Sequence, residues 1–240
     1  MKRIFLFSLL SVIIFSSCHH LFAKRIRGNG AIKTENRTVG TFTGVDVSGN
    51  IDVYVTQDSV ASVKIEADEN LLEYVQINAN GGTLDIRAER GYNLKPSKSI
   101  KVYVSGPLFK RFEASGACDI YSQNRISNSE GIGIHLSGAC DVTMEVNAPK
   151  VNADLSGAGT ITLKGETKDL SIDGSGSTDM KCFDLMAENA RIEISGAGDA
   201  QVYASMKLDV HVSGAGSVRY KGNATVSQEV SGAGSVKKAE

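Results

Sequence analysis

Apolar and polar residues alternate along most of this chain, and stretches with the 3.6-residue period of an amphipathic helix are hard to find. The runs GVDVSGNIDVYVTQ (44–57) and VKIEA (63–67) place an apolar side chain at nearly every second position. A period of two indicates strands with one buried face and one solvated face. The pattern therefore predicts an all-β protein.

The second half of the chain carries an internal repeat, marked by Ser-Gly followed by a small residue. The repeat recurs every 18 to 22 residues, at Ser115, Ser137, Ser156, Ser175, Ser195, Ser213 and Ser231. Ser48 and Ser105 open the same pattern further upstream, in VSGN and VSGP. A fixed period near 20 residues is typical of a solenoid, in which each repeat forms one coil that packs on its neighbours.

The residues that flank each serine indicate how a coil is built. In the units of Ser137, Ser156, Ser175, Ser195, Ser213 and Ser231, positions one, three and five before the serine are apolar or glycine except at Gln228. Positions five and seven after the serine are apolar in the units from Ser137 to Ser213. Ile100, Val102 and Val104 form the corresponding set before Ser105. Each coil is therefore expected to contain two strands that face inward, joined by a Ser-Gly-small turn.

Stacked coils bury their apolar columns against one another and leave the alternate positions wet. A coil of 18 to 20 residues is about 60 Å of chain at ~3.3 Å per residue, which suits a small single-stranded parallel β-helix. A right-handed coil is favoured because strand crossovers prefer that hand. An antiparallel sandwich would not require an in-phase repeat.

We expect one domain over residues 24–240, with regular coils in 106–240 and a less regular part in 31–105. Within that part, NANGG (78–82) reads as a hairpin-like turn, and DENLLEYV (68–75) as either a short helical turn or a bulge. The repeated serines are expected to be structural. A nucleophile elbow needs G-x-S-x-G between a strand and a helix, whereas this serine recurs seven times with no helix after it.

The first 23 residues read as a signal peptide. A basic start, MKR, precedes the apolar run IFLFSLLSVIIF, which is too short to span a bilayer as a mature helix. Small residues before Cys18 match a bacterial lipobox, in which that cysteine is lipidated, although Phe15 departs from the usual aliphatic residue. The alternative is cleavage after Ala23. Either way the mature chain is exported, and lipidation would anchor it to the outer membrane on its periplasmic or surface face.

Four stretches of the sequence resemble the auto-transporter adhesin head (GIN) domain family of exported, lipoprotein-like proteins from Bacteroides and its relatives. They are IRGNGAIKTENRTVGTFTGVDVSGNIDVYVTQ (26–57), IEADENLLEYV (65–75), GGTLDIRAE (81–89) and KVYVSGPLFKRFEASGACDIY (101–121). The resemblance covers roughly residues 26–238. It implies a parallel β-helix and adhesion at the cell surface, and it supplies no catalytic or binding residues.

Acidic side chains recur at outward positions of the repeat, two residues before and four residues after the serines. If the coils stack in register, Asp173, Asp179, Glu193 and Asp199 form the densest carboxylate group, and carboxylate oxygens are ligands that calcium accepts. The G-G-x-G-x-D motif of calcium-binding repeats is missing, and Arg191 and Lys181 can neutralise part of the charge. We therefore expect a solvated acidic edge with no metal or other cofactor, and keep these four residues as candidates for a calcium site.

Cys118 and Cys140 occupy the same place in consecutive SGAC turns, so stacking brings them within disulfide range. Side chains in a parallel ladder point the same way, however, and the sequence leaves open whether the two residues are bonded. Cys182 falls in an inward column and is expected to be buried. The sequence has no C-x-x-C or H-E-x-x-H motif for zinc.

The formal net charge of -1 and the small aromatic content, 6%, give no indication of a nucleic-acid partner. We expect a non-enzymatic envelope protein that presents a repetitive β-helix face to a glycan or protein ligand. The alternatives are a structural envelope protein that self-associates end to end, and a polysaccharide-degrading enzyme, which the short regular turns disfavour. The basic run KRIR (24–27) reads as a solvated tether or as an attraction to an anionic bilayer.

Overall fold

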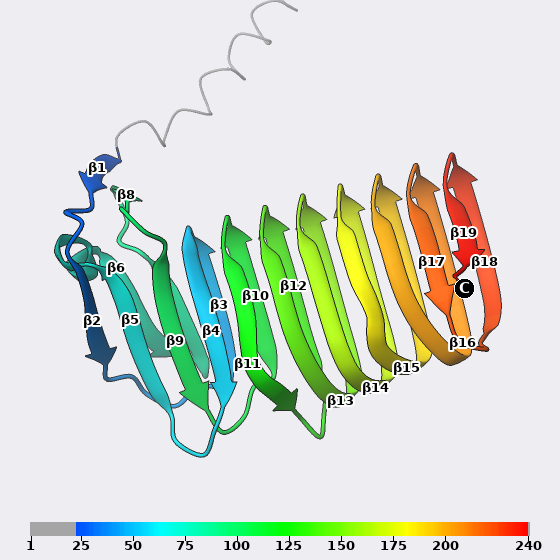
Figure 1. Ribbon diagram of the computed structural model, residues 1–240, viewed down its shortest axis with the longest axis horizontal. Coiled ribbons are helices and arrows are strands. Elements are labelled where there is room, and N and C mark those ends of the chain that lie inside the picture. Colours follow the sequence, from blue (N-terminus) through cyan, green and yellow to red (C-terminus); the bar gives the residue numbers. More distant parts are fainter. Residues whose placement is uncertain (1–22, 240) are drawn as a thin grey trace, which may run out of the picture.

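The computed structural model describes residues 23–239 and is almost entirely β-structure, with 74% of residues in strands. Parallel coils are stacked along one axis, as predicted, with the N-terminal part at one end and the C-terminus at the other (Figure 1). The strands of the regular part are β10 (Arg111–Gly116), β11 (Asp119–Ser127), β12 (Ile132–Gly138), β13 (Asp141–Gly157), β14 (Thr160–Gly176), β15 (Asp179–Gly196), β16 (Asp199–Gly214), β17 (Ser217–Lys221), β18 (Thr225–Gly232) and β19 (Ser235–Lys238).

The sequence period sets the register of the sheet. Each repeat residue pairs with its equivalent in the next coil, so that Ser156 pairs with Ser175, and Ser175 with Ser195. The serine ladder runs unbroken through Ser48, Ser115, Ser137, Ser156, Ser175, Ser195, Ser213 and Ser231. The repeat detected in the sequence is therefore the coil of the solenoid.

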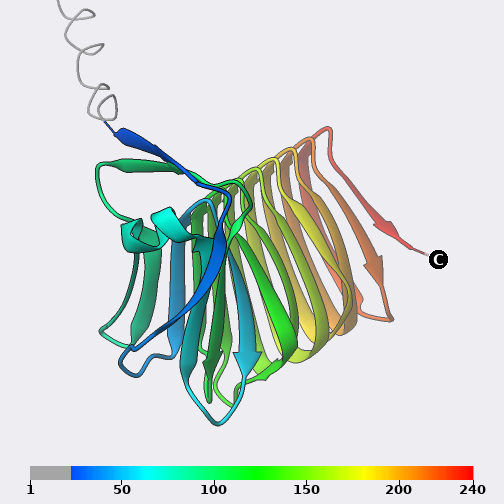
Figure 2. The ribbon, with the colours of Figure 1, turned by 60° about the vertical axis from the view of Figure 1, so that its left-hand side comes forward.

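Every coil consists of two facing walls (Figure 2). Wall 1 holds the residues that precede each serine, in β10, β12, the second halves of β13 to β16, and β18. Wall 2 holds the residues that follow it, in β11, the first halves of β13 to β16, β17 and β19. The predicted inward columns fill the space between the walls. In wall 1 the column Ile134, Ala153, Ile172, Ile192 and Val210 is at most 1% exposed, as is its wall 2 counterpart, Val142, Ile161, Met180, Ala200 and Val218.

At the corner between the walls, the glycine after each serine turns the chain. Gly176 has φ +101°, a conformation that residues with a Cβ rarely adopt. A Cβ at this glycine would lie 2.4 Å from the carbonyl oxygen of Gly157 in the previous coil. The backbone N–H of Ser177 donates to that same oxygen at 2.8 Å. Glycine is therefore required both by the turn and by the close approach of the next coil.

The N-terminal part contains β1 (Lys24–Arg27), β2 (Ile32–Arg37), β3 (Gly44–Gly49), β4 (Ile51–Gln57), β5 (Ser62–Asp68), η2 (a 3-10 helix, Glu69–Tyr74), β6 (Val75–Asn80), β7 (Thr83–Ala88), β8 (Tyr92–Lys95) and β9 (Ile100–Gly106). β3 and β4 form one complete coil, which stacks on β10 and β11 although about 60 residues separate them in sequence. β7 and β9 continue the two walls by parallel pairing with β3 and β4.

The expectation that residues 31–105 form the same kind of parallel coil is only partly correct. β5 pairs antiparallel with both β2 and β9, and β6 pairs antiparallel with β7 across the predicted NANGG turn. The stretch 68–75 forms the short helical turn and not the bulge.

The placement of Ser105 on the serine ladder is wrong. Ser105 pairs with Thr56 in wall 2, and Ile100, Val102 and Val104 are buried in that wall and not in wall 1. Gly106 lacks the positive φ of the corner glycines and Pro107 follows it, so residues 107–110, and not a Ser-Gly corner, lead from β9 in wall 2 to β10 in wall 1. The motif VSG marks the end of a strand without showing which wall the strand belongs to.

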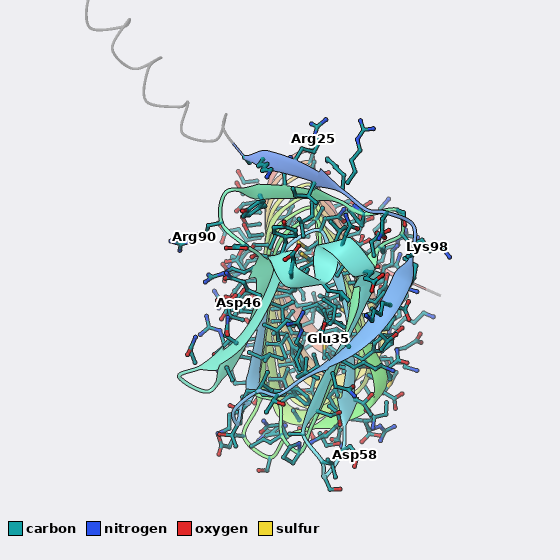
Figure 3. The ribbon with its side chains drawn as sticks, turned by 90° about the vertical axis from the view of Figure 1, so that its left-hand side faces the viewer. Arg25, Glu35, Asp46, Asp58, Arg90 and Lys98 are labelled. Atoms are coloured by element: carbon teal, nitrogen blue, oxygen red, sulfur yellow. The ribbon has the colours of Figure 1, made fainter. Side chains whose placement is uncertain are left out.

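A cap closes the N-terminal end of the stack. η2 lies across this end and buries its own residues Leu71 and Leu72 against the protein, and β2 runs along the outer edge (Figure 3). Asp68, fully buried, holds two loops of the cap in place. Its carboxylate accepts hydrogen bonds from Gly30 N at 2.7 Å, Ser97 N at 2.8 Å and Ser97 Oγ at 2.6 Å. Burial alone would raise the pKa of Asp68, but these hydrogen bonds together lower it.

The last described coil is more open than the others. In β18, Val230 is 39% exposed and Gln228 is also exposed, whereas the equivalent residues Val212 and Val210 of β16 are buried. Gln228 is the one polar residue in the wall 1 columns, and the structure places it where water can reach it.

Substitution of Gly176 by alanine tests the corner. We expect a loss of about 1 to 3 kcal/mol in the free energy of unfolding, because the Cβ strains the backbone and meets the carbonyl of Gly157. Denaturant titration measures the loss. Gly49→Ala is the matched control, because Gly49 has φ +108° but no atom within 4 Å of the added Cβ. Equal losses in the two variants would contradict the coil-to-coil contact.

Asp68→Asn tests the cap. The pKa of Asp68 is lowered in the folded state, so its stabilisation is fully present above the unfolded value near pH 4 and is lost as pH falls through the folded value. We expect the variant to be about 1 to 3 kcal/mol less stable at pH 7, since an amide cannot accept all three hydrogen bonds. The difference between the two proteins should shrink in acid denaturation series below pH 4. A difference independent of pH would rule out the carboxylate as the cause.

Candidate functional site

Two longitudinal rows of outward side chains distinguish the walls, and the first is an acidic column on wall 1. Its residues lie two positions before the serines, as predicted, and occupy one register line across the sheet. Two further carboxylates extend the column into the N-terminal part. It comprises Asp85, Asp46, Glu113, His135, Asp154, Asp173, Glu193, His211 and Glu229.

The two histidines separate groups of carboxylates within the acidic column. His135 Nδ1 lies 2.8 Å from Asp154 Oδ2, and His211 Nε2 lies 3.6 Å from Glu229 Oε2. Where no histidine intervenes, carboxylates face one another. Partial burial and the neighbours Glu193 and Asp154 raise the pKa of Asp173.

The same effect occurs nearer the N-terminus, where partial burial and then Glu113 and Asp85 raise the pKa of Asp46. A shallow groove of about 400 Å³ lies between the acidic column and the serine ladder, where His135, Ser137 and Ser156 are among its lining residues. The acidic column therefore forms one side of an open groove that runs along the coils.

The four candidate calcium ligands do not come together. Asp173 pairs with Glu193 on wall 1, while Asp179 pairs with Asp199 on wall 2, on the other side of the corner. Arg191 forms an ion pair with Glu193, one of the neutralising contacts that the sequence suggested. Across residues 23–239 no group of three or more His, Cys, Asp or Glu side chains is arranged to hold a metal ion.

Cys118 and Cys140 lie in adjacent coils, as the SGAC repeat predicts, and both are fully buried free thiols. Asp141 N donates to the carbonyl oxygen of Cys118, which places the two turns in direct contact. The hydrogen bond with Cys140 and burial raise the pKa of the Cys118 thiol. The sequence left open whether the two residues are bonded, and in this structure they are not. Cys182 is also a buried free thiol, in its expected inward column.

The second row, which the sequence analysis missed, is a tyrosine ladder on wall 2. It consists of Tyr103, Tyr54 and Tyr121, which occupy one register line on β9, β4 and β11. The rings of Tyr54 and Tyr103 stack with centroids 5.2 Å apart, and those of Tyr54 and Tyr121 with centroids 5.3 Å apart. All three side chains are partly exposed.

A signal for part of the tyrosine ladder was present in the sequence. Tyr54 and Tyr121 each lie six residues after a serine of the ladder, Ser48 and Ser115, so counting outward positions on wall 2 would have paired them. Tyr103 could not be found in this way, because its strand β9 reaches the register line from outside the repeat. The small aromatic content of the chain, 6%, says nothing about whether its aromatic residues cluster.

Charged and hydroxyl groups surround the tyrosine ladder. Lys64 Nζ lies 4.6 Å from the ring centroid of Tyr103 and covers that end of the stack. At the other end, the exposed Thr143 is the next residue in register after Tyr121. The Tyr121 hydroxyl donates to Asp119 Oδ2 at 3.0 Å. Burial and this hydrogen bond raise the pKa of Tyr121 to about 12, so the phenol stays a neutral donor at physiological pH.

The predicted signal peptide and the lipidation site at Cys18 lie outside the described residues. Within the described part, no helix has the length and apolar character needed to cross a membrane.

These features define a class of protein, a β-solenoid with short corners that displays in-register rows of side chains on two open walls. The chain belongs to the family described as "Putative auto-transporter adhesin, head GIN domain", whose model matches residues 41–224. The resemblance noted from the sequence is therefore confirmed. A comparison with curated proteins finds no match.

Solved structures share the fold. A protein from Bacteroides fragilis described as a putative adhesin superposes with a TM-score of 0.83 at 22% identity, covering 89% of this chain and 100% of its own. One from Parabacteroides distasonis, described as a putative lipid binding protein, has a TM-score of 0.69 at 24% identity, covering 90% and 100%. A putative adhesin from Parabacteroides merdae has a TM-score of 0.64 at 22% identity, covering 91% and 100%.

Asp173→Asn tests the electrostatics of the acidic column. The pKa of Asp173 is raised on folding, so its charge destabilises the folded protein above that pKa, and the penalty disappears as pH falls below the unfolded value. We expect the variant to be more stable than the parent at pH 7, by less than about 1 kcal/mol. Denaturation at low ionic strength should show the gain. High salt should reduce it by screening Glu193 and Asp154, and pH 3 should remove it. A variant less stable at pH 7 would contradict the register repulsion.

Proposed function

We propose that the protein is a non-enzymatic adhesin of the cell envelope that binds a glycan at the tyrosine ladder of wall 2. The observation that carries the proposal is the stack of three partly exposed tyrosines, bordered by carboxylates and threonines. Membership of the adhesin head family supports a cell-surface or exported protein. The names of the Bacteroides fragilis and Parabacteroides merdae structures agree with that class.

The end of the tyrosine ladder has the chemistry of a sugar subsite. Tyr54 covers one face of the Tyr121 ring, and the short side chain of Thr143 leaves the opposite face accessible. A pyranose presents an apolar C–H face to an aromatic ring and hydroxyl groups at its rim. Polar side chains placed around an aromatic surface then fix the orientation of the ligand. Asp119, Asp141 and the Thr143 hydroxyl surround this ring face on the same wall.

The same arrangement disfavours a catalytic role. A polysaccharide-degrading enzyme would need an acid and a base placed on either side of a scissile bond. On wall 2, Asp119 accepts the hydrogen bond of Tyr121, and the neighbouring Asp141 accepts one from Thr160 N at 2.8 Å. These contacts hold the carboxylates as acceptors beside the wall and support a binding role.

The location of the protein is part of the proposal. The signal peptide and the lipobox predict export and lipidation of Cys18, which would attach the solenoid by its N-terminal end to the outer membrane. Metabolic labelling with a fatty acid, compared between the parent and Cys18→Ser, tests the anchor separately from ligand binding.

Self-association end to end is the second candidate function. It is favoured by β18, in which Gln228 and Val230 are exposed at positions that are buried in the preceding coil. A second copy that pairs with this strand would cover them, since a strand edge invites pairing with another chain. Light scattering across a concentration series tests this function, and a protein that stays monomeric at high concentration would count against it.

A glycan array tests the adhesin function. We expect saturable binding to one glycan class, and about a tenfold weaker affinity for Tyr121→Ala, because the variant loses the aromatic surface. Tyr203→Ala is the control, since Tyr203 is a partly exposed wall 2 tyrosine outside the ladder. The array is repeated with calcium and with chelator to test the acidic candidates. Equal weakening by both tyrosine variants, or no glycan binding, would contradict the proposal.

A further inference from the structure

A small basic surface covers one side of the N-terminal cap. β1 and β8 form a two-stranded parallel sheet, in which Arg25 pairs with Asn93 and Arg27 with Lys95. Because paired residues of a parallel sheet share a face, Arg25, Arg27 and Lys95 project from the same face of this sheet. Lys24 begins β1 on the opposite face, and Arg90 and Lys98 lie beside the two strands. We call these six residues the basic plate: Lys24, Arg25, Arg27, Arg90, Lys95 and Lys98.

The opposite face of the two-stranded sheet is apolar except at Lys24 and attaches the sheet to the protein. Ile26, Tyr92 and Leu94 share that face, and the Tyr92 ring lies 4.6 Å from the ring of Tyr74 in η2. Leu94 packs against the hydrophobic core. The two strands therefore form an amphipathic layer, in which Arg25, Arg27 and Lys95 lie on the face away from the hydrophobic core.

Hydrogen bonds fix the position of the basic plate relative to the solenoid. Asn70 of η2 donates from Nδ2 to the carbonyl oxygen of Arg27 at 2.8 Å, and its Oδ1 accepts from Asn29 N at 2.9 Å. Asp68 holds Gly30, which follows β1, and Ser97, which follows β8. The run KRIR is thus an ordered strand in the structure, in contrast to the solvated tether that the sequence suggested.

The charge of the basic plate is not compensated. None of its six cations forms an ion pair with any residue in 23–239, and all six are exposed. Glu89 is the one acidic residue in the two segments 24–30 and 89–98 that carry them. In Figure 3, Arg25 lies at the top of the N-terminal end, with Arg90 and Lys98 lower on opposite sides, and Glu35, Asp46 and Asp58 lie below them. This local excess contrasts with a net charge of -1 for the whole chain.

The basic plate lies close in sequence to the predicted lipidation site, and this limits its distance from the membrane. Lys24 lies six residues after Cys18, a distance of at most about 20 Å of extended chain. An acyl chain on Cys18 would therefore hold the plate close to the headgroups of the bilayer. A basic surface beside a lipid anchor adds electrostatic attraction to anionic headgroups.

We propose that the basic plate is a docking surface for the anionic headgroups of a lipid bilayer, which it contacts through Arg25, Arg27 and Lys95. The proposal rests on the proposed export of the protein but not on the glycan function. Because η2 and Asp68 fix the plate to the coils, docking also sets the orientation of the solenoid on the membrane. The acidic column would then be repelled from the bilayer, while the walls stay free.

Vesicle binding without the lipid anchor isolates the contribution of the basic plate. The protein is residues 18–240 with Cys18→Ser, and its folding is checked by circular dichroism and denaturant titration. The vesicles contain phosphatidylcholine alone, or equal parts phosphatidylcholine and phosphatidylglycerol. We expect co-flotation with the anionic vesicles only, and its loss at high salt, since surface charge interactions are screened. Equal binding to both kinds of vesicle would overturn the proposal.

Charge-neutralising variants locate the interaction. The triple variant Arg25→Gln, Arg27→Gln, Lys95→Gln should bind anionic vesicles about a hundredfold more weakly, at about fivefold per cation. The control Lys168→Gln, Lys207→Gln, Lys237→Gln changes the net charge equally at exposed positions in the regular coils, and should bind like the parent. Equal weakening by the two triple variants would overturn the proposal. If the first variant fails to fold, Arg90→Gln with Lys98→Gln, outside the β1–β8 pairing, should weaken binding about 25-fold.

A fluorescence probe tests the docked orientation. The chain has no tryptophan, so Asn93→Trp introduces a single reporter on the face of the plate that carries Arg25 and Arg27. Its emission should shift to shorter wavelength when anionic vesicles are added. Thr143→Trp, on wall 2, should show no shift. A shift of equal size for the two reporters would mean that the plate is not the contact surface.

Discussion

The close approach of backbone to backbone at each corner is the constraint on which the whole structure depends. The carbonyl oxygen of Gly157 accepts a hydrogen bond from Ser177 N, and a Cβ on Gly176 would collide with this same oxygen. The same contact recurs from Gly49 to Gly232. Only glycine fits at this corner, and the position of the glycine therefore fixes where each coil begins. Once the corners are in line, every other residue of the repeat meets its own equivalent in the neighbouring coil.

This register has opposite consequences inside and outside the coils. Inside the coils, equivalent residues of neighbouring coils are apolar and pack together favourably. Columns such as Ile172, Ile192 and Val210 are buried between the two walls and exclude water. Outside the coils, the contact between equivalent side chains is favourable or unfavourable, depending on their chemistry. Tyrosines in register stack and extend an aromatic surface, whereas carboxylates in register repel and raise the pKa of Asp173. The histidines at His135 and His211 interrupt that repulsion. The outward rows are therefore the part of the repeat in which stability does not dictate residue type, and function can use them.

The regular coils could be predicted from the sequence because their information is local and periodic. The serine spacing and the alternation around it gave the register, the buried columns and the corner turns. The N-terminal part could not be predicted in the same way, since β3 and β4 stack on strands about 60 residues away and an antiparallel cap is inserted between them. Ser105 shows the cause of the error, because its motif is local while its wall is set by pairing with Thr56. The same limit concealed the tyrosine ladder, whose members come from inside and outside the repeat, and it concealed the basic plate, which exists only when β1 meets β8.

The two ends of the solenoid differ in a way that connects fold and location. The N-terminal end is closed by η2 and β2 and carries uncompensated positive charge, whereas the acidic column begins beside the cap, at Asp85 and Asp46, and runs away from it. Opposite charges thus occupy different faces of one rigid body, which gives the protein a preferred orientation beside an anionic surface. Because the coils share one register, that orientation extends to every row of side chains along the stack. A protein held at its capped end therefore presents the tyrosine ladder on a side wall, close to the cap, where β9, β4 and β11 meet. A ligand site there would favour partners that approach along the membrane surface over partners that approach the distal end.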